Sequence, residues 1–308
     1  MLLELQNISK SYGAKEAVRN LSLQVPHGVL YGIIGPNGAG KTTTIRMIMN
    51  IIAPDSGDIL YDGRPVTDSF TDIVGYLPEE RGLYKKMTLS EVMIYMSELK
   101  GVPSSTTRER LGPWLEKMDL GQYRDKKVEE LSKGMAQKLQ FITTILHNPS
   151  VIILDELFSG LDPINIELIK SILLELKREG KTILFSTHVM EQAEKLCDYI
   201  CMISRGQKVI DGKLSEVRSR FGTNSIQVEM DGDGAFVRQI SGVKGLTEFN
   251  NYIELDLEDN ADTNAILNQM SQRVKIKRFQ IMEPSLYDIF IDLAKIDPRE
   301  LEGEAPHA

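Results

Sequence analysis

The sequence predicts an α/β fold with a mainly parallel sheet, followed by a small α+β domain. Two short, almost continuous apolar runs, at 29–34 and 151–154, are typical of strands that are buried on both faces of a sheet. Such runs alternate along the chain with amphipathic stretches of helical length. Strands that alternate with helices build a parallel sheet, because the crossover helices cover its faces.

The same patterns place the elements of the first 220 residues in order. Apolar runs and period-two alternation predict strands at 2–8, 17–25, 29–34, 74–77, 151–154 and 182–186. Amphipathic periodicity predicts helices at 42–49, 90–100, 104–118, 132–147, 164–179 and 189–196. We expect a turn at 11–13 to end the first strand, and Asn148-Pro149 to end the fourth of these helices.

The rest of the chain differs in both pattern and charge. Residues 221–308 carry 8 basic and 16 acidic side chains, whereas residues 1–220 carry 28 of each. Predicted strands at 225–230, 252–257 and 274–281 and helices at 261–272 and 285–295 give a small α+β domain over 221–298. The domain boundary is expected in the turn-rich stretch 221–224, and the acidic end 299–308 is expected to be flexible.

Composition and charge exclude several classes of protein. With 42% hydrophobic and 26% charged residues, the 308-residue chain has the composition of one or two globular domains. No nucleic-acid partner is expected, and the net charge of −8 lies wholly in residues 221–308. No apolar run approaches the roughly 20 residues of a membrane helix. The first residues lack a signal segment, and two cysteines are too few for disulfides to stabilise a chain of this length. A cytoplasmic protein is therefore expected.

A glycine-rich loop is the clearest chemical motif. Residues 35–42, Gly-Pro-Asn-Gly-Ala-Gly-Lys-Thr, fit the pattern G-x-x-x-x-G-K-[ST] between a predicted buried strand and a helix. Backbone N–H groups of such a loop and the start of its helix bind phosphates. Lys41 is placed for the β- and γ-phosphates, and the Thr42 hydroxyl for Mg²⁺. The nucleotide-binding residues predicted here are Gly35, Asn37, Gly38, Ala39, Gly40, Lys41, Thr42 and Thr43.

A second predicted strand ends in two acids that suit the same chemistry. Asp155 and Glu156 follow the buried run 151–154. Asp155 would hold Mg²⁺, mostly through water, and Glu156 would polarise the water that attacks the phosphate. Acids at the end of a strand can also cap helices, and the phosphate loop upstream disfavours that alternative.

Taken together, these motifs resemble the ATP-binding subunit of an ABC transporter over residues 1 to about 220. Residues 131–135, Leu-Ser-Lys-Gly-Met, are similar to the signature segment of that family. The resemblance implies that Ser132 and Gly134 grip the γ-phosphate of an ATP held by a second copy. It also implies that Tyr12 stacks on adenine, that 159–162, ending in Asp162, crosses the dimer interface, and that His188 contacts the γ-phosphate and orients the water.

The resemblance implies a P-loop NTPase fold of the ABC type with a helical subdomain, and an ATPase that uses ATP and Mg²⁺. It further implies a head-to-tail homodimer and a separate membrane-spanning permease, contacted through 79–97. The chain would then be peripheral on the inner face of the cell membrane. Two other classes stay open: a non-transport ABC switch acting on ribosomes or DNA, and a binding-only module with impaired hydrolysis.

Three positions depart from the family pattern. Lys133 stands where the family has glycine, Met135 where it has glutamine, and Glu79 where it has a glutamine that meets the metal. We expect Glu79 still to bind Mg²⁺ or its water. With the run 79–84, these variants resemble single-domain exporters of the sodium or drug-efflux type, and 282–290 resembles part of their accessory domain.

Two sets of sulfur-containing residues have simpler interpretations. Cys197 and Cys201 are expected one helical turn apart if the helix at 189–196 continues, as small buried residues and not as metal ligands. Met87, Met93 and Met96 are expected in the core of the helical subdomain, with a partial contact to the permease as the alternative.

Overall fold

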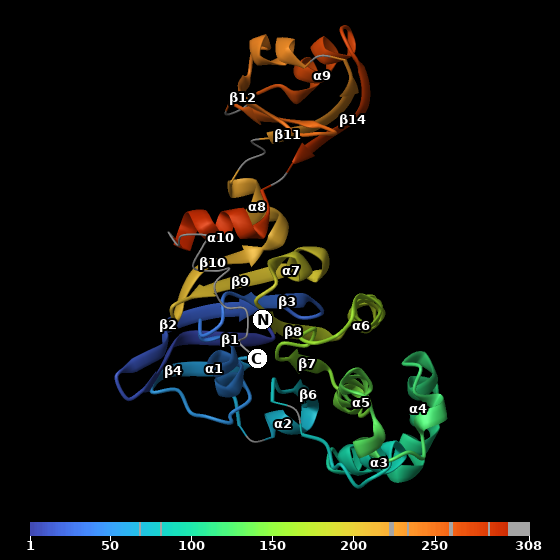
Figure 1. Ribbon diagram of the computed structural model, residues 1–308. Coiled ribbons are helices and arrows are strands. Elements are labelled where there is room, and N and C mark those ends of the chain that lie inside the picture. The colour runs from blue at the N-terminus through green and yellow to red at the C-terminus, as the bar shows by residue number, and fades with distance from the viewer. Residues whose placement is uncertain are drawn as a thin grey trace. The chain divides into compact units, whose positions relative to one another are not determined.

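The computed structural model (Figure 1) describes residues 1–67, 69–80, 82–221, 225–232, 234–258, 261–282 and 284–294. The chain divides into two compact units, Met1–Lys213 and Leu214–Ala308. This division precedes helix α8 (Leu214–Arg220), whereas the sequence placed the boundary after it. Of the expected boundary stretch only Phe221 is described, and the expected acidic end 299–308 lies outside the described residues.

A six-stranded sheet forms the centre of the first unit, in the order β10-β9-β3-β8-β7-β6. Its strands are β3 (Leu30–Ile34), β6 (Val74–Leu77), β7 (Val151–Leu154), β8 (Thr182–Thr187), β9 (Tyr199–Ser204) and β10 (Gln207–Lys213). All neighbours pair in parallel except β10, which runs antiparallel to β9. Strands β3, β7 and β8 are buried along their whole length, which confirms the predicted parallel sheet with both faces covered.

A separate antiparallel sheet, β2-β1-β4-β5, completes the sheet structure of this unit. Its strands are β1 (Leu3–Tyr12), β2 (Lys15–Val25), β4 (Ser56–Tyr61) and β5 (Arg64–Pro65). The predicted turn at 11–13 is wrong, because β1 continues to Tyr12, which pairs with Lys15 across a two-residue turn. Gly13 makes that turn possible with a φ of 61°. The hairpin thereby brings Tyr12 to the edge of the phosphate loop's pocket.

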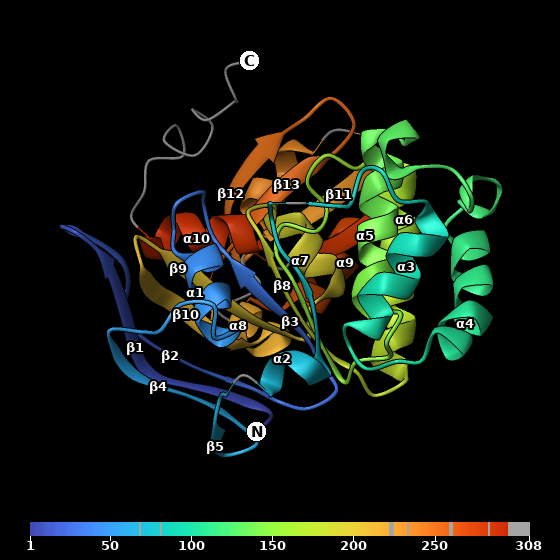
Figure 2. The ribbon, with the colours of Figure 1, turned by 90° about the horizontal axis from the view of Figure 1, so that it is seen from below.

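Helices surround the central sheet. They are α1 (Lys41–Ile48), α2 (Phe70–Ile73), α3 (Leu89–Glu98), α4 (Ser104–Lys117), α5 (Lys133–Ile145), α6 (Pro163–Arg178) and α7 (Met190–Leu196), with short 3₁₀ turns η1 (Gly121–Tyr123) and η2 (Val128–Glu130). Figure 2 shows α3 and α4 beside α5, on the side away from β1, β2 and β4. This group is the predicted helical subdomain, and Met93 is fully buried within it.

The helix at 189–196 does not continue to the cysteines, so the condition for a one-turn spacing is not met. Helix α7 ends at Leu196, so Cys197 follows it and Cys201 lies on β9. Both thiols are buried, and burial raises the pKa of Cys201 to about 12. They are therefore small core residues, as expected, although they do not share a helix.

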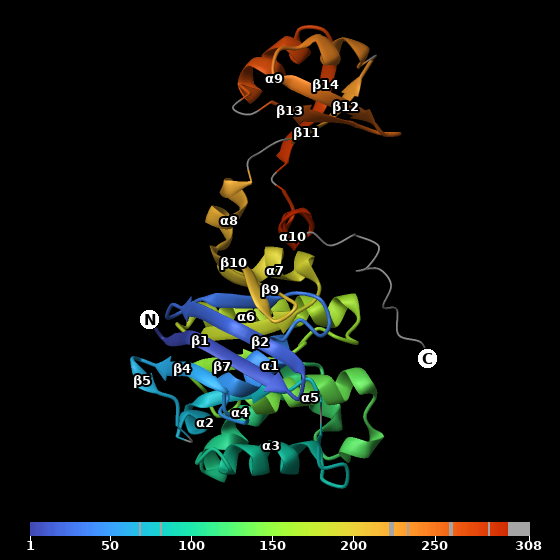
Figure 3. The same ribbon diagram turned by 90° about the vertical axis from the view of Figure 1, so that its left-hand side faces the viewer.

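The second unit contains an antiparallel sheet in the order β12-β13-β11-β14. Its elements are α8, β11 (Ser225–Asp231), η3 (Ala235–Gln239), β12 (Val243–Glu248), β13 (Ile253–Leu257), α9 (Thr263–Ser271), β14 (Lys275–Met282) and α10 (Leu286–Ala294). Helix α9 covers one face of this sheet (Figure 3), where Ile266 and Met270 pack on Val228 and Leu255. Among the described residues, no helix has the length and apolar character needed to cross a lipid bilayer.

Candidate nucleotide-binding site

The loop between β3 and α1 has a backbone that only glycine permits at two points. Gly35 has a φ of 153°, and a Cβ there would lie 2.0 Å from the carbonyl oxygen of Ile203. Gly40 has a φ of 108°, and a Cβ there would lie 2.4 Å from the carbonyl oxygen of Ala17. Positive φ values and this close approach explain both glycines. The loop therefore curls tightly before helix α1 begins at Lys41.

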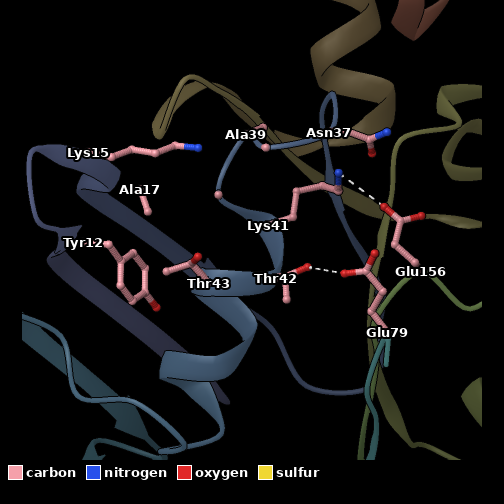
Figure 4. Close-up of a pocket in the computed structure, with 12 residues that line it drawn as sticks. Tyr12, Lys15, Ala17, Asn37, Ala39, Lys41, Thr42, Thr43, Glu79 and Glu156 are labelled. Carbon is pink, nitrogen blue, oxygen red and sulfur yellow. Dashed lines mark hydrogen bonds and ion pairs between the residues drawn. The ribbon is translucent and has the colours of Figure 1, made fainter. Parts of the chain in front are cut away.

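This loop forms one wall of a pocket of about 370 Å³ (Figure 4). The pocket is lined by Tyr12, Lys15, Ala17, Asn37, Gly38, Ala39, Gly40, Lys41, Thr42, Thr43, Glu79 and Glu156. Of the predicted loop residues, only Gly35 does not line it, and the Gly35 carbonyl instead accepts a hydrogen bond from Lys41. The predicted adenine contact Tyr12 lies at the rim, with half of its surface exposed. Lys15 is a second cation in the wall that sequence reasoning missed.

Lys41 is held inside the loop. Its side chain is 5% exposed, and Nζ donates to the carbonyl oxygens of Gly35 (2.9 Å) and Pro36 (3.1 Å). The same Nζ lies 3.3 Å from Oε1 of Glu156. The loop therefore presents its cation at the start of α1, where backbone N–H groups also favour an anion.

Thr42 brings two carboxylates together. Its Oγ1 lies 3.3 Å from Oε2 of Glu79 and 3.3 Å from Oδ1 of Asp155. Asp155 is fully buried, and its Oδ2 has no hydrogen-bond partner among the described residues. Burial raises the pKa of Asp155, hydrogen bonds from Ser186 and Thr42 lower it, and the charges of Glu79 and Glu156 raise it further. An unsatisfied buried carboxylate oxygen beside a hydroxyl and a second carboxylate fits a hard cation such as Mg²⁺.

Glu156 is fixed from two sides. It has a φ of 49°, which is uncommon for a non-glycine residue, and its N–H donates to Oγ of Ser186 at 3.0 Å. Ser186 in turn donates to Asp155, so one hydroxyl orients both acids. On the carboxylate, Oε2 lies 3.0 Å from Nδ1 of His188. Ser186 was not predicted from the sequence. Its position at the end of a buried strand, two residues before His188, could have indicated it.

The residues that the family resemblance assigns to the dimer interface, Ser132, Gly134 and Asp162, do not line this pocket. Ser132 is the N-cap of α5 and accepts from the Met135 N–H (3.2 Å), and Asp162 is the N-cap of α6 and accepts from the Asn165 N–H (3.0 Å). The Asn165 hydrogen bond lowers the pKa of Asp162. Both caps are exposed, and Gly134 has open space at the position a Cβ would take. Within one copy of the chain, these residues do not line the pocket of Lys41.

Two protein-family models match parts of this chain. Residues 18–159 match the family model of ABC transporters, and residues 212–294 match that of the C-terminal domain of DrrA1-3-like ATP-binding proteins. The chain is 41% identical to the uncharacterized ABC transporter ATP-binding protein YhaQ of Bacillus subtilis, over 94% of this chain and 98% of that one. It is 36% identical to the Nod factor export ATP-binding protein I of Burkholderia orbicola, over 80% of this chain and 82% of that one.

A solved structure described as the ATP binding subunit of an ABC transporter has the same fold. It superposes with a TM-score of 0.67 and 32% identity, over 72% of this chain and 94% of that one. The phosphate loop, the acids at the end of β7 and these matches lead to one conclusion. The chain belongs to the family of ABC transporter ATP-binding proteins.

Proposed function

We propose that the chain binds ATP with Mg²⁺ and hydrolyses it to power transport through a separate membrane-spanning permease. The observation that carries this proposal is the position of Glu156. Its carboxylate lies between Lys41 (3.3 Å) and His188 (3.0 Å), at the edge of a pocket lined by the phosphate loop. A carboxylate held there can orient a water molecule toward a phosphate bound by the loop.

The other residues of the site bind the phosphates, the base and the metal. Asn37 to Thr43 and the start of α1 bind the phosphates, and Tyr12 at the rim stacks on the base. Thr42, Asp155 and Glu79 would hold Mg²⁺, which would neutralise phosphate charge when bound. His188 holds the carboxylate of Glu156 in place and would contact the γ-phosphate.

A second copy of the chain would complete the site. Ser132 and Gly134 lie at the exposed start of α5 and outside the pocket of their own chain. Asp162 is likewise exposed at the start of α6. We infer a head-to-tail homodimer in which these residues of one copy face the nucleotide of the other. Closure of that dimer on ATP, and its opening after hydrolysis, supplies the movement for transport.

The contact with the permease is proposed for 79–97. This stretch exposes Tyr84 and Tyr95, whose rings pack edge to face at 5.2 Å, and Leu83 and Lys85 lie in the wall of a groove of about 530 Å³. Met87 and Met96, which also belong to this stretch, are only partly buried. Through this contact the chain would be peripheral on the inner face of the cell membrane. Export is the proposed direction, because the relative from Burkholderia orbicola is named for Nod factor export.

The domain assignment is part of the proposal. The ATP-binding domain, 1–220, corresponds largely to the first unit, and the accessory domain, 221–298, to the second. No nucleic-acid partner is proposed.

Two measurements test this function. The purified chain should release phosphate from ATP in the presence of Mg²⁺ and stop when the metal is chelated. Capture of the tagged chain from detergent-solubilised membranes should bring down a membrane-spanning protein, and the yield should fall when Tyr84 and Tyr95 are both changed to Ser. A chain that binds ATP without releasing phosphate would contradict hydrolysis, and capture of the chain alone would contradict the permease.

A further inference from the structure

A single buried side chain joins helix α5 to the loop that follows Glu156. Gln137 is 1% exposed, and its Nε2 donates to the carbonyl oxygens of Leu157 (2.9 Å) and Ser159 (3.0 Å). Both N–H bonds of its amide are therefore used on this loop. The helix that presents Ser132 and Gly134 at its start is thus tied, in its second turn, to the segment directly after the proposed catalytic carboxylate.

The loop itself is compact. The Ser159 N–H donates to the carbonyl oxygen of Glu156 (3.2 Å), and the Leu161 N–H donates to that of Phe158 (3.3 Å). Leu157 is fully buried, and the ring of Phe158 packs edge to face on Phe185. A displacement of Leu157 would therefore act on the backbone of its neighbour Glu156, which already has a left-handed φ of 49°.

The same face of α5 makes a second contact with this loop. Lys133 lies four residues before Gln137, which places both side chains on one side of the helix. A Cβ built on Gly160 would lie 3.5 Å from Cε and Nζ of Lys133, so the lysine side chain covers that glycine. Lys133, one of the departures from the family signature, therefore reinforces the connection that Gln137 makes.

The unused atom of the amide shows that Gln137 is more than a packing residue. Its Oε1 is buried and has no hydrogen-bond partner in the described part of the chain. An unsatisfied buried carbonyl lowers the stability of the folded state, so a position that served packing alone would suit an apolar side chain. The contact of Nε2 with the loop is the property that an apolar residue would lose.

We propose that Gln137 is a positioning residue that holds the loop from Glu156 to Asp162 against helix α5. The inference rests on the proposed ATPase and dimer. In that dimer, the start of α5 grips the nucleotide of one site, while Glu156 of the same copy serves the other site. Gln137 makes helix α5 and the loop after Glu156 move together. Glu156 therefore takes the position in which it orients water when Ser132 and Gly134 bind a nucleotide.

Three variants of the full chain test this role. Gln137→Met keeps the length of the side chain and removes both donors. Gln137→Lys restores donors that can reach two carbonyl oxygens, as Lys41 does in the phosphate loop. Gln140→Met is the matched control, because it makes the same change nearly one turn further along α5, at a side chain that is 7% exposed and makes no described hydrogen bond to the loop.

The readouts are turnover, nucleotide affinity and amide hydrogen exchange of 157–161. We expect Gln137→Met to lower kcat by about tenfold or more, to leave the affinity for a fluorescent ATP analogue within about twofold, and to speed exchange in the loop. Gln137→Lys should recover most of the turnover and protection, and Gln140→Met should match the parent. Unchanged turnover in Gln137→Met, or an equal loss of affinity and kcat, would overturn the role.

Failure of this inference differs from failure of the proposed function. If the parent chain releases no phosphate, the proposed ATPase activity is wrong. Hydrogen exchange then still tests whether Gln137 holds the loop. If amide exchange in 157–161 is the same in the parent and in Gln137→Met, Gln137 does not hold the loop, and this conclusion does not depend on the turnover measured.

Discussion

The ammonium group of Lys41 lies 3.3 Å from Oε1 of Glu156, and the two side chains are only 5% and 10% exposed. The cation of the phosphate loop is therefore paired with the carboxylate proposed to orient the attacking water. Phosphate oxygens are stronger partners for a lysine than loop carbonyls, because they carry charge. We expect a bound γ-phosphate to draw Lys41 away from Glu156 and leave that carboxylate to the water.

Lys41→Ala should abolish most nucleotide binding. The change removes a charge-assisted contact to the phosphates, which is worth about 1.5–3 kcal/mol, or about 10–100-fold in affinity. Titration with a fluorescent ATP analogue measures the loss, and Lys126→Ala, at an exposed lysine outside the pocket, is the control. An affinity within twofold of the parent would remove the phosphate-loop assignment.

Glu79→Gln separates the two effects of the glutamate that stands in place of the family's glutamine. Its Oε2 lies 3.3 Å from Oγ1 of Thr42, so its charge opposes the phosphates but suits the metal. The variant should bind ATP without Mg²⁺ about two- to tenfold more tightly than the parent, and should gain less affinity when Mg²⁺ is added.

The matched control for that variant is Glu80→Gln. It removes the same charge one residue away, at an exposed side chain outside the pocket lining. Isothermal titration with and without Mg²⁺ compares the three proteins. Equal shifts in both variants would show that Glu79 acts through general charge and not through the Thr42 site.

His147 should make the fold sensitive to acid. Burial, assisted by the charge of Lys100, lowers the pKa of this half-buried histidine from 6.5 to about 4. Between these values the unfolded chain binds more protons than the folded one, so stability falls as the pH drops from 6.5 toward 4. Discounted for partial exposure, the loss is about 1–2 kcal/mol.

Chemical denaturation at pH 7 and pH 4.5 measures this loss. His147→Gln should lose less stability over that interval than the parent, because no histidine has to charge on unfolding at this position. His27→Gln, at an exposed histidine, is the control. The same loss in His147→Gln as in the parent would assign the acid sensitivity to other groups.

The phosphate site was predictable because its signals are local in sequence. The buried strand β3, the loop at 35–42 and the start of α1 are contiguous, and their spacing reports the backbone shape that phosphates need. The acids after β7 follow from the same logic. Four strands of the first unit, β4, β5, β9 and β10, were not predicted. Strand β4 contains Gly57 and Asp58, which have low strand propensity, and it forms because it pairs with β1. Strand β9 pairs with β3, and β10 pairs with β9, which are contacts that local patterns do not report.

The residues that connect the site were beyond local patterns. Gln137 contacts a carbonyl 20 residues away, and Ser186 contacts a carboxylate 31 residues away. Such contacts depend on how helix α5 and strand β8 are placed against β7, which no spacing in the sequence reports. Ser132 and Asp162 were found by resemblance, and the structure adds that each also caps a helix. Alanine at either position therefore costs about 1 kcal/mol of stability in addition to any loss at the nucleotide.

The central claim is that Glu156 drives hydrolysis in a dimer closed on ATP. Sedimentation velocity of Glu156→Gln tests it most directly, because the amide keeps the shape of the side chain and removes its basicity. With ATP and Mg²⁺, the variant should sediment as two chains and release no phosphate, whereas without nucleotide it should sediment as one. The double variant with Lys41→Ala should stay a single chain throughout. Phosphate release at the parent's rate, or a single chain in saturating ATP, would contradict the account.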